Sequence, residues 1–303
     1  MLDLTGKVAV IIGAGSGIGR GIALALAKAG ADVVVSDLFP DRAGETASQA
    51  KILGRNAVAR EVDVRDPELV HALAATAVDE FGRLDICVAN AGIGRLGSVL
   101  SLSLDDWNDV IAVNQTGVFL TVQACAREMV RLKRGGRIIT LASIAAEQPS
   151  ARLFPYNATK AAVRMMTRCW ALDLAPFGIT VNSIGPGVID TPLGELAAGS
   201  TESFQAVAAA IPLGRTGRTE DIGNLACWLA SDEASYVTGT YNVIDGGYLD
   251  RPWHGADAVT SQYVDARKRM EEMSGDDLLD SIDQLNNQAT QTVTAHRDKL
   301  GLQ

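Results

Sequence analysis

Short apolar runs alternate along the chain with longer segments in which apolar residues recur at helical spacing. The apolar runs are mostly rich in Val and Ile, are bounded by Gly, Asn or Asp, and cover residues 8–13, 32–37, 56–63, 84–92, 136–143, 179–187 and 240–247. Continuous runs of this kind are typical of parallel strands that are buried on both faces. Residues 19–30 and 67–82 show helical spacing and end at glycine, a common helix stop.

This alternation predicts the fold class. Strands that alternate with helices form right-handed βαβ units, so we expect an α/β, Rossmann-like, doubly wound parallel sheet of about seven strands with helices on both faces. We expect a single catalytic domain over residues 1–250 and a helical extension over 251–303 that packs on its own or a neighbouring subunit. The alternative is that the extension covers the active site of its own or an adjacent subunit as a lid. In the extension, Ser274 and Asp277 resemble a capping box, and one apolar stripe contains Leu278, Ile282, Leu285, Ala289 and Val293.

A glycine-rich turn lies where such a sheet would bind a nucleotide. The residues GAGSGIG, 13–19, follow the first predicted strand directly and open the first helix. Glycines let the backbone approach a pyrophosphate closely, and the helix N-terminus offers free N–H groups and a positive dipole end. The turn alone is weak evidence. The strand before it, the helix after it and the acid Asp37 at the end of the second strand together predict a dinucleotide site.

Asp37 indicates which dinucleotide this site binds. Its carboxylate can accept hydrogen bonds from the adenosine ribose hydroxyls, and it would repel a 2′-phosphate. Neither Leu38 nor Ser16 offers a cation that could hold that phosphate. We therefore expect NAD rather than NADP as the cofactor, although an acid at this position without the glycine turn would be read as a solvated loop residue.

The segment PYNATKA, residues 155–161, places Tyr156 four residues before Lys160. In a helix this spacing puts both side chains on one face. An ammonium within about 4 to 6 Å of a phenol favours the phenolate and brings the phenol pKa from about 10 toward the range of a general base. The pair therefore suggests a proton-transfer device. The same spacing also occurs by chance, as a surface pair or as a half-buried ring with a snorkelling lysine.

Composition and charge exclude several other classes of protein. The chain has 303 residues, of which 47% are hydrophobic and 21% charged, as in an ordinary soluble globular protein. Its formal net charge of −9 argues against a nucleic-acid partner. The apolar run near the N-terminus is too short to span a bilayer and lacks a cleavage pattern, so we expect no membrane partner and a cytoplasmic location. The four cysteines lie far apart without a CxxC motif, so we expect neither a disulfide framework nor a metal site.

Residues 5–249 resemble the short-chain dehydrogenase/reductase family, whose members share a series of motifs in fixed order. In this sequence the motifs are Gly13, Gly17 and Gly19 in the turn, Asp63-Val64, Asn90-Ala91-Gly92, Asn114, Ser143, Tyr156 with Lys160, and Pro186-Gly187 followed by Thr191. One departure is Ile12, where the family usually has a threonine before the first glycine. Because Ile12 has no hydroxyl to tie the loop, the departure puts the rigidity of the loop in question.

The resemblance implies an oxidoreductase that transfers a hydride between NAD(H) and a secondary alcohol or its ketone. Tyr156 would be the general acid and base, and Lys160 would lower its pKa and bind the nicotinamide ribose. Ser143 would hydrogen-bond the reacting oxygen, which gains charge in the transition state. Asn114 would hold a water in the proton relay. An equally weighted role for Asn114 is a buried amide that ties two elements together, and the two roles are compatible.

The resemblance also implies the cofactor contacts. Asp63 would hydrogen-bond the adenine amino group and Val64 would pack on its ring, while Asn90 and Gly92 would line the floor of the site. Thr191 resembles the residue that meets the carboxamide, but it could equally be the N-cap of the next helix. The expected cofactor set is Gly13, Ser16, Gly17, Ile18, Gly19, Asp37, Asp63, Val64, Asn90, Ala91, Gly92, Tyr156, Lys160, Pro186, Gly187, Ile189 and Thr191.

The sequence says less about the substrate, which we expect to be a small secondary alcohol or its ketone, with a polyol or sugar-like substrate and a cyclic alcohol equally favoured. Near the reacting centre we expect Ala145, Glu147, Gln148, Arg152 and Val188, with Arg95 as a further candidate. Arg95 and Arg152 could bind a substrate carboxylate or phosphate, but surface arginines are common and this role is the less favoured one. The alternative functions are a 3-oxoacyl thioester reductase, which often prefers NADPH and is therefore opposed by Asp37, and a non-catalytic dinucleotide-binding scaffold. Because the family usually forms dimers or tetramers, we expect a homotetramer or homodimer.

Overall fold

The computed structural model describes residues 2–194 and 207–250, together with 268, 272–274 and 277. The predicted extension 251–303, with its apolar stripe, lies almost entirely outside the described residues, as does the middle of the expected substrate loop. At the expected capping box, Ser274 Oγ accepts a hydrogen bond from the Asp277 backbone N–H at 3.3 Å and donates one to Asp277 Oδ2 at 2.6 Å.

The described residues contain one seven-stranded parallel sheet with the strand order β3-β2-β1-β4-β5-β6-β7. Every apolar run singled out in the sequence contains one of its strands, which confirms the predicted fold class. Most of the strands are shorter than the runs because the flanking Gly, Asn and Asp residues lie outside the hydrogen-bonded ladder. The strands are β1 Val8–Ile12, β2 Asp32–Asp37, β3 Ala57–Glu61, β4 Ile86–Ala89, β5 Gly136–Leu141, β6 Ile179–Pro186 and β7 Tyr241–Ile244.

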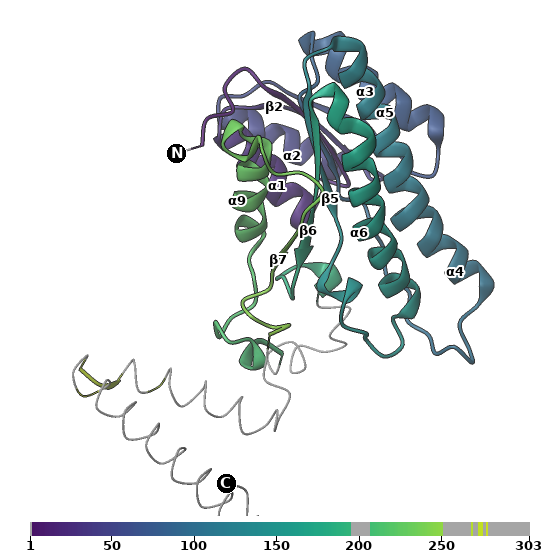
Figure 1. Ribbon diagram of the computed structural model, residues 1–303, viewed down its shortest axis with the longest axis vertical. Coiled ribbons are helices and arrows are strands. Elements are labelled where there is room, and N and C mark those ends of the chain that lie inside the picture. The colour runs from purple at the N-terminus through teal and green to yellow at the C-terminus, as the bar shows by residue number, and fades with distance from the viewer. Residues whose placement is uncertain (1, 195–206, 251–267, 269–271, 275–276, 278–303) are drawn as a thin grey trace, which may run out of the picture.

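Helices cover both faces of the sheet, as Figure 1 shows. One layer contains α1 Gly17–Lys28, α2 Pro40–Ile52 and α9 Thr219–Ala230. The other contains α3 Pro67–Phe81, α4 Leu104–Ile111, α5 Gly117–Leu132 and α6 Phe154–Leu174. Shorter helical turns are η1 Ala112–Thr116, η2 Ile144–Ala146, η3 Ala175–Phe177 and η4 Asp232–Ala234. None of the described helices is long and apolar enough to cross a membrane.

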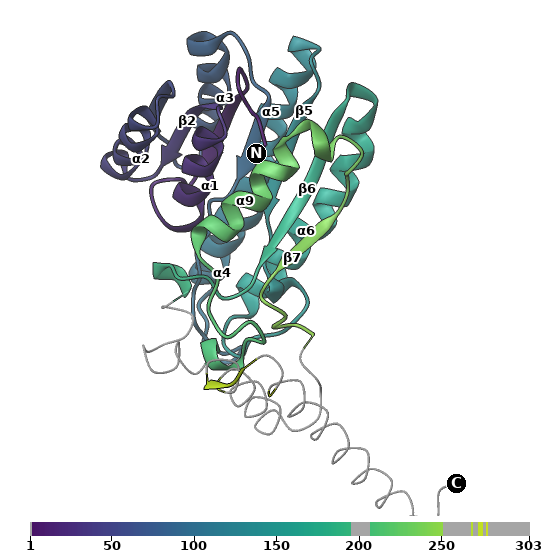
Figure 2. The same ribbon diagram turned by 90° about the vertical axis from the view of Figure 1, so that its left-hand side faces the viewer.

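The sheet separates two apolar cores, which explains why the strands read as continuous apolar runs. Ile11 and Val33 pack toward α1, α2 and α9, whereas their neighbours Val10 and Val34 pack toward the opposite helices. The helices α1 and α9 lie side by side across the first core, as Figure 2 shows. Gly223 permits this close packing, because a Cβ there would lie only 2.7 Å from the Cβ of Ala25.

The strand order changes direction between β1 and β4, which are neighbours in the sheet although two strands separate them in the chain. The chain leaves β1 for one face of the sheet and β4 for the other, so a crevice forms beyond the carboxyl ends of these two strands. The glycine-rich turn follows β1 and Asn90 follows β4, so the fold places two of the predicted motifs at the same edge.

Candidate active site

A cavity of about 850 Å³ lies at the carboxyl ends of β1, β4, β5 and β6. It brings together most of the residues that the sequence predicted, although they come from separate segments of the chain. Gly19, Asn114, Glu147 and Arg152 do not line it. The predicted residues that do are Gly13, Ser16, Gly17, Ile18, Asp37, Asp63, Val64, Asn90, Ala91, Gly92, Ser143, Ala145, Gln148, Tyr156, Lys160, Pro186, Gly187, Val188, Ile189 and Thr191.

The glycine-rich turn is packed tightly against the end of β4. Gly13 has a φ of +71°, and a Cβ on it would lie 2.7 Å from the Ala91 Cα. A Cβ on Gly19 would collide with the Gly13 carbonyl and lie 2.5 Å from Asn90 Nδ2. Both glycines are therefore required by contacts within the protein. The first N–H groups of α1 donate no hydrogen bond to the Ser16 side chain, and Gly17 and Ile18 line the cavity, so this helix end is suited to bind an anion.

The loop is tied by hydrogen bonds that do not involve residue 12. Ile12 is buried in the second core, where its side chain contributes to packing. Instead, Asn90 Nδ2 donates to the Gly13 carbonyl at 2.7 Å, and the buried hydroxyl of Thr46 on α2 donates to the Ala14 carbonyl at 2.9 Å. Thr46 on α2 thus supplies the hydroxyl that Ile12 lacks, and the loop is held in place without a threonine at position 12.

Asp37 lies at one end of the cavity and holds the turn from the side. Its Oδ2 accepts a hydrogen bond from the Gly15 N–H at 2.9 Å, and its Oδ1 accepts one from the Phe39 N–H at 3.1 Å. Leu38 and Phe39 also line the cavity and are about half exposed. The guanidinium of Arg42 lies over the Phe39 ring at 4.4 Å from its centroid. Sequence reasoning considered only Leu38 and Ser16 and missed this cation.

Asp63 and Val64 line the cavity beside Asp37, because the Val62 N–H donates to the Asp37 carbonyl at 3.0 Å. The side chain of Arg65 donates to both carboxylate oxygens of Asp63, at 2.6 Å to Oδ2 and 3.0 Å to Oδ1. This hydrogen bonding holds the pKa of Asp63 below its ordinary value of 3.8, so the carboxylate stays ionised. Val64 is buried against Gly117, where a Cβ would lie 2.7 Å from Val64 Cγ2. Arg65 was not predicted, because its partner could be identified only from the folded loop.

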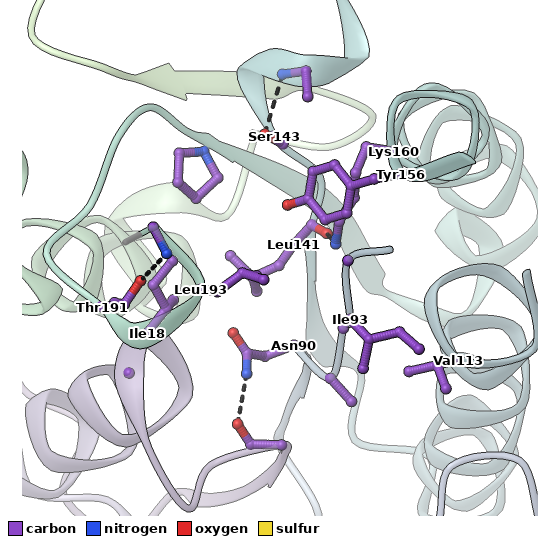
Figure 3. A pocket seen from close by; sticks show the side chains of 18 of the residues that line it. Ile18, Asn90, Ile93, Val113, Leu141, Ser143, Tyr156, Lys160, Thr191 and Leu193 are labelled. Carbon is purple, nitrogen blue, oxygen red and sulfur yellow. Dashed lines mark hydrogen bonds between the residues drawn. The ribbon is translucent and has the colours of Figure 1, made fainter. Parts of the chain in front are cut away.

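Tyr156 and Lys160 share one face of α6, which confirms the prediction from their spacing. Pro155 occupies the first turn of the helix, where its missing N–H costs no hydrogen bond. Figure 3 shows the Tyr156 hydroxyl directed into the cavity with Lys160 beside its ring. The Lys160 Nζ lies 5.3 Å from the centroid of the Tyr156 ring and donates to the Leu141 carbonyl at 2.7 Å.

Burial controls the protonation of this pair. It lowers the pKa of Lys160 from 10.5 to about 8, because the ammonium loses water. Burial raises the pKa of Tyr156 above 10.0, and a hydrogen bond with the Ser143 side chain offsets part of that rise. We expected Lys160 to lower the pKa of Tyr156. The structure instead shows a net rise, because removing the phenol from water outweighs the other effects.

Ser143 and Asn114 approach the pair from two other elements. Ser143 follows β5, and its Oγ accepts a hydrogen bond from the Ala145 N–H at 3.1 Å at the start of η2. Asn114 lies in η1, a π-helical turn between α4 and α5, and is fully buried. Its amide exchanges two hydrogen bonds with the backbone of Ile93, at 2.8 Å and 2.9 Å. The structural role expected for Asn114 is therefore present.

The geometry around Gly92 leaves room for the second role of Asn114. A Cβ on Gly92 would lie 3.5 Å from both Asn114 Oδ1 and Lys160 Nζ, so the carbonyl oxygen and the ammonium flank the same glycine. A π-helical turn inside an α-helix is frequent at functional sites, where it redirects a side chain. Thr191 also has its simpler role, because its Oγ1 accepts a hydrogen bond from the Gly194 N–H at 3.1 Å, as an N-cap does.

The substrate end of the cavity is more apolar than the sequence suggested. Arg95 lines it but pairs with Asp106 at 3.2 Å and with Asp109 at 3.3 Å, so its charge is balanced. Arg152, which has a φ of +64°, is not part of the lining. Sequence reasoning missed the apolar lining because its residues come from separate loops and short helical turns with no common periodicity, namely Ile93, Leu96, Leu153, Leu193 and Val207.

Comparisons with known proteins cover the same part of the chain. Residues 13–249 match the family described as enoyl-(acyl carrier protein) reductase. The chain is 39% identical over 247 residues to glucose 1-dehydrogenase 2 of Bacillus subtilis, a match that covers 81% of this chain and 95% of that protein.

Solved structures give the same result. A short-chain type dehydrogenase/reductase from Mycobacterium marinum is 41% identical with a TM-score of 0.78, over 82% of this chain and 98% of that one. Carveol dehydrogenase from Mycobacterium avium in complex with NAD is 32% identical with a TM-score of 0.79, over 83% of this chain and all of that one.

Proposed function

The chain belongs to the short-chain dehydrogenase/reductase family, and on this premise we propose that it transfers a hydride between NAD(H) and a secondary alcohol or its ketone. One observation carries the proposal: the Tyr156 hydroxyl enters a cavity beside Ser143 and Lys160, at the crevice where the glycine-rich turn also ends. A protein that only bound a dinucleotide would have no chemical need for this phenol and serine together.

The residues of the cavity fit a nicotinamide dinucleotide. The uncapped N-terminus of α1 would bind the pyrophosphate, Asp37 the adenosine ribose, and Asp63 with Val64 the adenine. Lys160 would bind the second ribose, and Thr191, which also lines the cavity, would meet the carboxamide. When bound, the nicotinamide ring supplies the acceptor or donor of the hydride.

The proton moves through residues of the chain itself. In the oxidation of an alcohol, Tyr156 takes the hydroxyl proton, and in the reverse reaction the phenol returns it. Ser143 donates a hydrogen bond to the same oxygen of the substrate, where charge develops. Because burial raises the pKa of Tyr156, the phenol is protonated at neutral pH and is ready to act as an acid. When Tyr156 acts as a base it must pass the proton on, so we assign Lys160 and Asn114 to the path by which the proton leaves.

We propose that NAD is preferred over NADP. The support is Asp37, whose carboxylate lies beside the turn at 2.9 Å from the Gly15 nitrogen, where it would meet the ribose hydroxyls and repel a phosphate. Two cations lie near the turn: Arg20 is engaged by Glu45 at 2.9 Å, and Arg42 lies over the Phe39 ring at 4.4 Å from its centroid. The preference also opposes a 3-oxoacyl thioester reductase that depends on NADPH.

We propose further that the substrate is a neutral small molecule. Arg65 and Arg95, which line the described part of the cavity, are ion-paired with Asp63 and with Asp106 and Asp109. A carboxylate or phosphate on the substrate would have to break one of these pairs. The apolar side chains around Leu193 instead suit a ring or a hydrocarbon body. The partners that we propose are this substrate and further copies of the chain, which form a homotetramer or homodimer. We propose no nucleic-acid or membrane partner, and we propose that the protein is located in the cytoplasm.

Parallel titrations with NADH and NADPH, followed by turnover assays on neutral secondary alcohols, test the proposal. We expect NADH to bind at least about tenfold more tightly, because a misplaced phosphate beside a carboxylate costs roughly 1.4 kcal/mol or more. Tyr156→Phe should keep NADH binding and lose turnover. Tighter NADPH binding would contradict the role of Asp37. Binding without any turnover would favour the dinucleotide-binding scaffold.

A further inference from the structure

One tyrosine on the last strand reaches back to the residue that we place on the reacting oxygen. Tyr241, the first residue of β7, donates a hydrogen bond from its hydroxyl to the backbone carbonyl of Ser143 at 2.7 Å. The same carbonyl accepts a second bond from the Ala146 N–H at 2.9 Å. The main chain of Ser143 is therefore fixed by a side chain from another strand, while the Ser143 hydroxyl lies beside Tyr156.

The ring of Tyr241 is held in turn by the helix that carries Tyr156. The guanidinium of Arg164 lies over the ring at 4.6 Å from its centroid, and it pairs with Glu147 at 3.0 Å. Glu147 immediately follows η2, and Ser143 is the residue before η2. Arg164 therefore contacts both the Tyr241 ring and the segment that begins at Ser143. Arg164 comes four residues after Lys160, which itself comes four after Tyr156. The three side chains therefore lie along one side of α6.

The neighbouring strand leaves room for this tyrosine. Gly185 on β6 faces the Tyr241 ring, and a Cβ added to Gly185 would lie 2.5 Å from both the Cζ and the hydroxyl oxygen of Tyr241. A Cβ at that distance would force the ring to move. Gly185 and Tyr241 therefore fit each other as a pair, and the hydrogen bond to Ser143 depends on both.

The hydroxyl of Tyr241 also stays protonated. Burial raises the pKa of Tyr241 to about 12, with a smaller contribution from Glu147. The donor to Ser143 is therefore kept at every pH at which Tyr156 would act on a substrate.

We propose that Tyr241 is a positioning residue that sets the place of the Ser143 hydroxyl relative to Tyr156, with Arg164 and Gly185 keeping Tyr241 in place. The effect of Tyr241 on turnover rests on the proposed function, whereas its effect on Tyr156 rests on the bond from Tyr241 to Ser143 and on the place of Ser143 beside Tyr156 in the cavity. The Ser143 side chain lowers the pKa of Tyr156. A Ser143 that is less well placed should therefore let the pKa of Tyr156 rise.

The test is an NMR titration of the full chain, labelled with ¹³C at the tyrosine Cζ, from pH 7 to 11. The Tyr156 signal is identified by its loss in Tyr156→Phe. We expect Tyr241→Phe and Ser143→Ala to move this signal in the same direction at pH 7 and to shift its titration to higher pH. The double variant should show no further shift, because Tyr241 acts through Ser143. Tyr236→Phe, at a fully exposed tyrosine, is the matched control and should leave the Tyr156 signal unchanged.

An unchanged Tyr156 signal in Tyr241→Phe, or effects of the two substitutions that add, would overturn the proposal. If Tyr241→Phe does not fold, as judged by its thermal unfolding, Arg164→Met serves instead. This variant removes the cation over the ring and leaves the hydroxyl, and a smaller shift in the same direction is then expected. A Tyr156 signal unchanged in Arg164→Met would equally overturn the proposal.

Turnover gives a second readout, with NAD and cyclohexanol as a neutral probe substrate. Tyr241→Phe should lower kcat roughly tenfold with little change in KM or in the dissociation constant of NADH. A misplaced Ser143 hydroxyl reduces the stabilisation of the transition state but not the binding of substrate or cofactor. In the Ser143→Ala background the same substitution should cost nothing more. A wild-type protein that turns over no secondary alcohol would contradict the proposed function, while the NMR result would still decide the role of Tyr241.

Discussion

At the residue scale, Lys160 shows that the candidate site is maintained at a cost in stability. The side chain is buried, and burial lowers its pKa from 10.5 in the unfolded chain to about 8. Between these two values the unfolded chain binds more protons than the folded one, so the contribution of Lys160 to stability rises with pH across this window. Below pH 8 the full cost of the buried ammonium is present.

Chemical denaturation of wild type and Lys160→Met at pH 7 to 10 tests this cost. The difference between the free energies of unfolding of wild type and variant should shift in favour of wild type by about 2 kcal/mol between pH 8 and pH 10, since one pKa unit corresponds to about 1.36 kcal/mol. Comparing the two proteins cancels the titration of groups that they share, such as Cys227. A constant difference over this range would mean that the Lys160 pKa is not lowered.

At the element scale, the tie between α2 and the glycine-rich turn can be tested through Thr46. Thr46→Val removes the hydroxyl that donates to the buried Ala14 carbonyl and accepts from Arg20 Nε, while keeping the shape of the side chain. An unpaired buried carbonyl costs about 1 to 3 kcal/mol. We expect lower thermal stability and weaker NADH binding, by roughly tenfold, because the turn is no longer held in shape.

Thr76→Val is the matched control for this substitution. Thr76 donates only to the Ala72 carbonyl within α3, at 3.0 Å, and lies away from the turn. The substitution Thr76→Val should leave the dissociation constant of NADH unchanged. Equal effects of the two substitutions on NADH binding would show that Thr46 acts through general stability and not through the turn.

The elements around the site also show how much of the site could be predicted from the sequence. Periodicity identified the strands, and the i to i+4 spacing identified the face of α6 that carries Tyr156, because both depend on local geometry alone. The hydroxyl of Thr46 and the phenol of Tyr241 could not be found this way. Each acts on a residue that is distant in the chain, Ala14 or Ser143, and the contact exists only once the sheet has brought the elements together. The π-helical turn at Asn114 has no sequence signature that we recognised.

At the scale of the whole molecule, the helix layer of α5 and α6 has an outer surface that an isolated chain would leave in water. Met165 and Leu172 on α6 are 55% and 78% exposed, and Phe119 on α5 is 40% exposed. Isolated exposed apolar residues are normal, but Met165 and Leu172 lie seven residues apart and therefore share one face of α6, and exposed apolar side chains on one face mark a surface for association. We therefore propose that a contact between subunits of the homo-oligomer lies on this layer.

Leu172→Glu tests this placement, because a carboxylate buried in a contact between subunits costs several kcal/mol when it is unpaired. Light scattering coupled to size exclusion should show a smaller assembly than wild type, and that assembly should still bind NADH, since Leu172 is not part of the cavity lining. Ile52→Glu, at an equally exposed residue at the end of α2 on the other layer, should leave the assembly unchanged. If Leu172→Glu and wild type have the same mass, the contact lies elsewhere. If wild type is a monomer, the proposed homo-oligomer is wrong, and the apolar surface of α6 needs another partner.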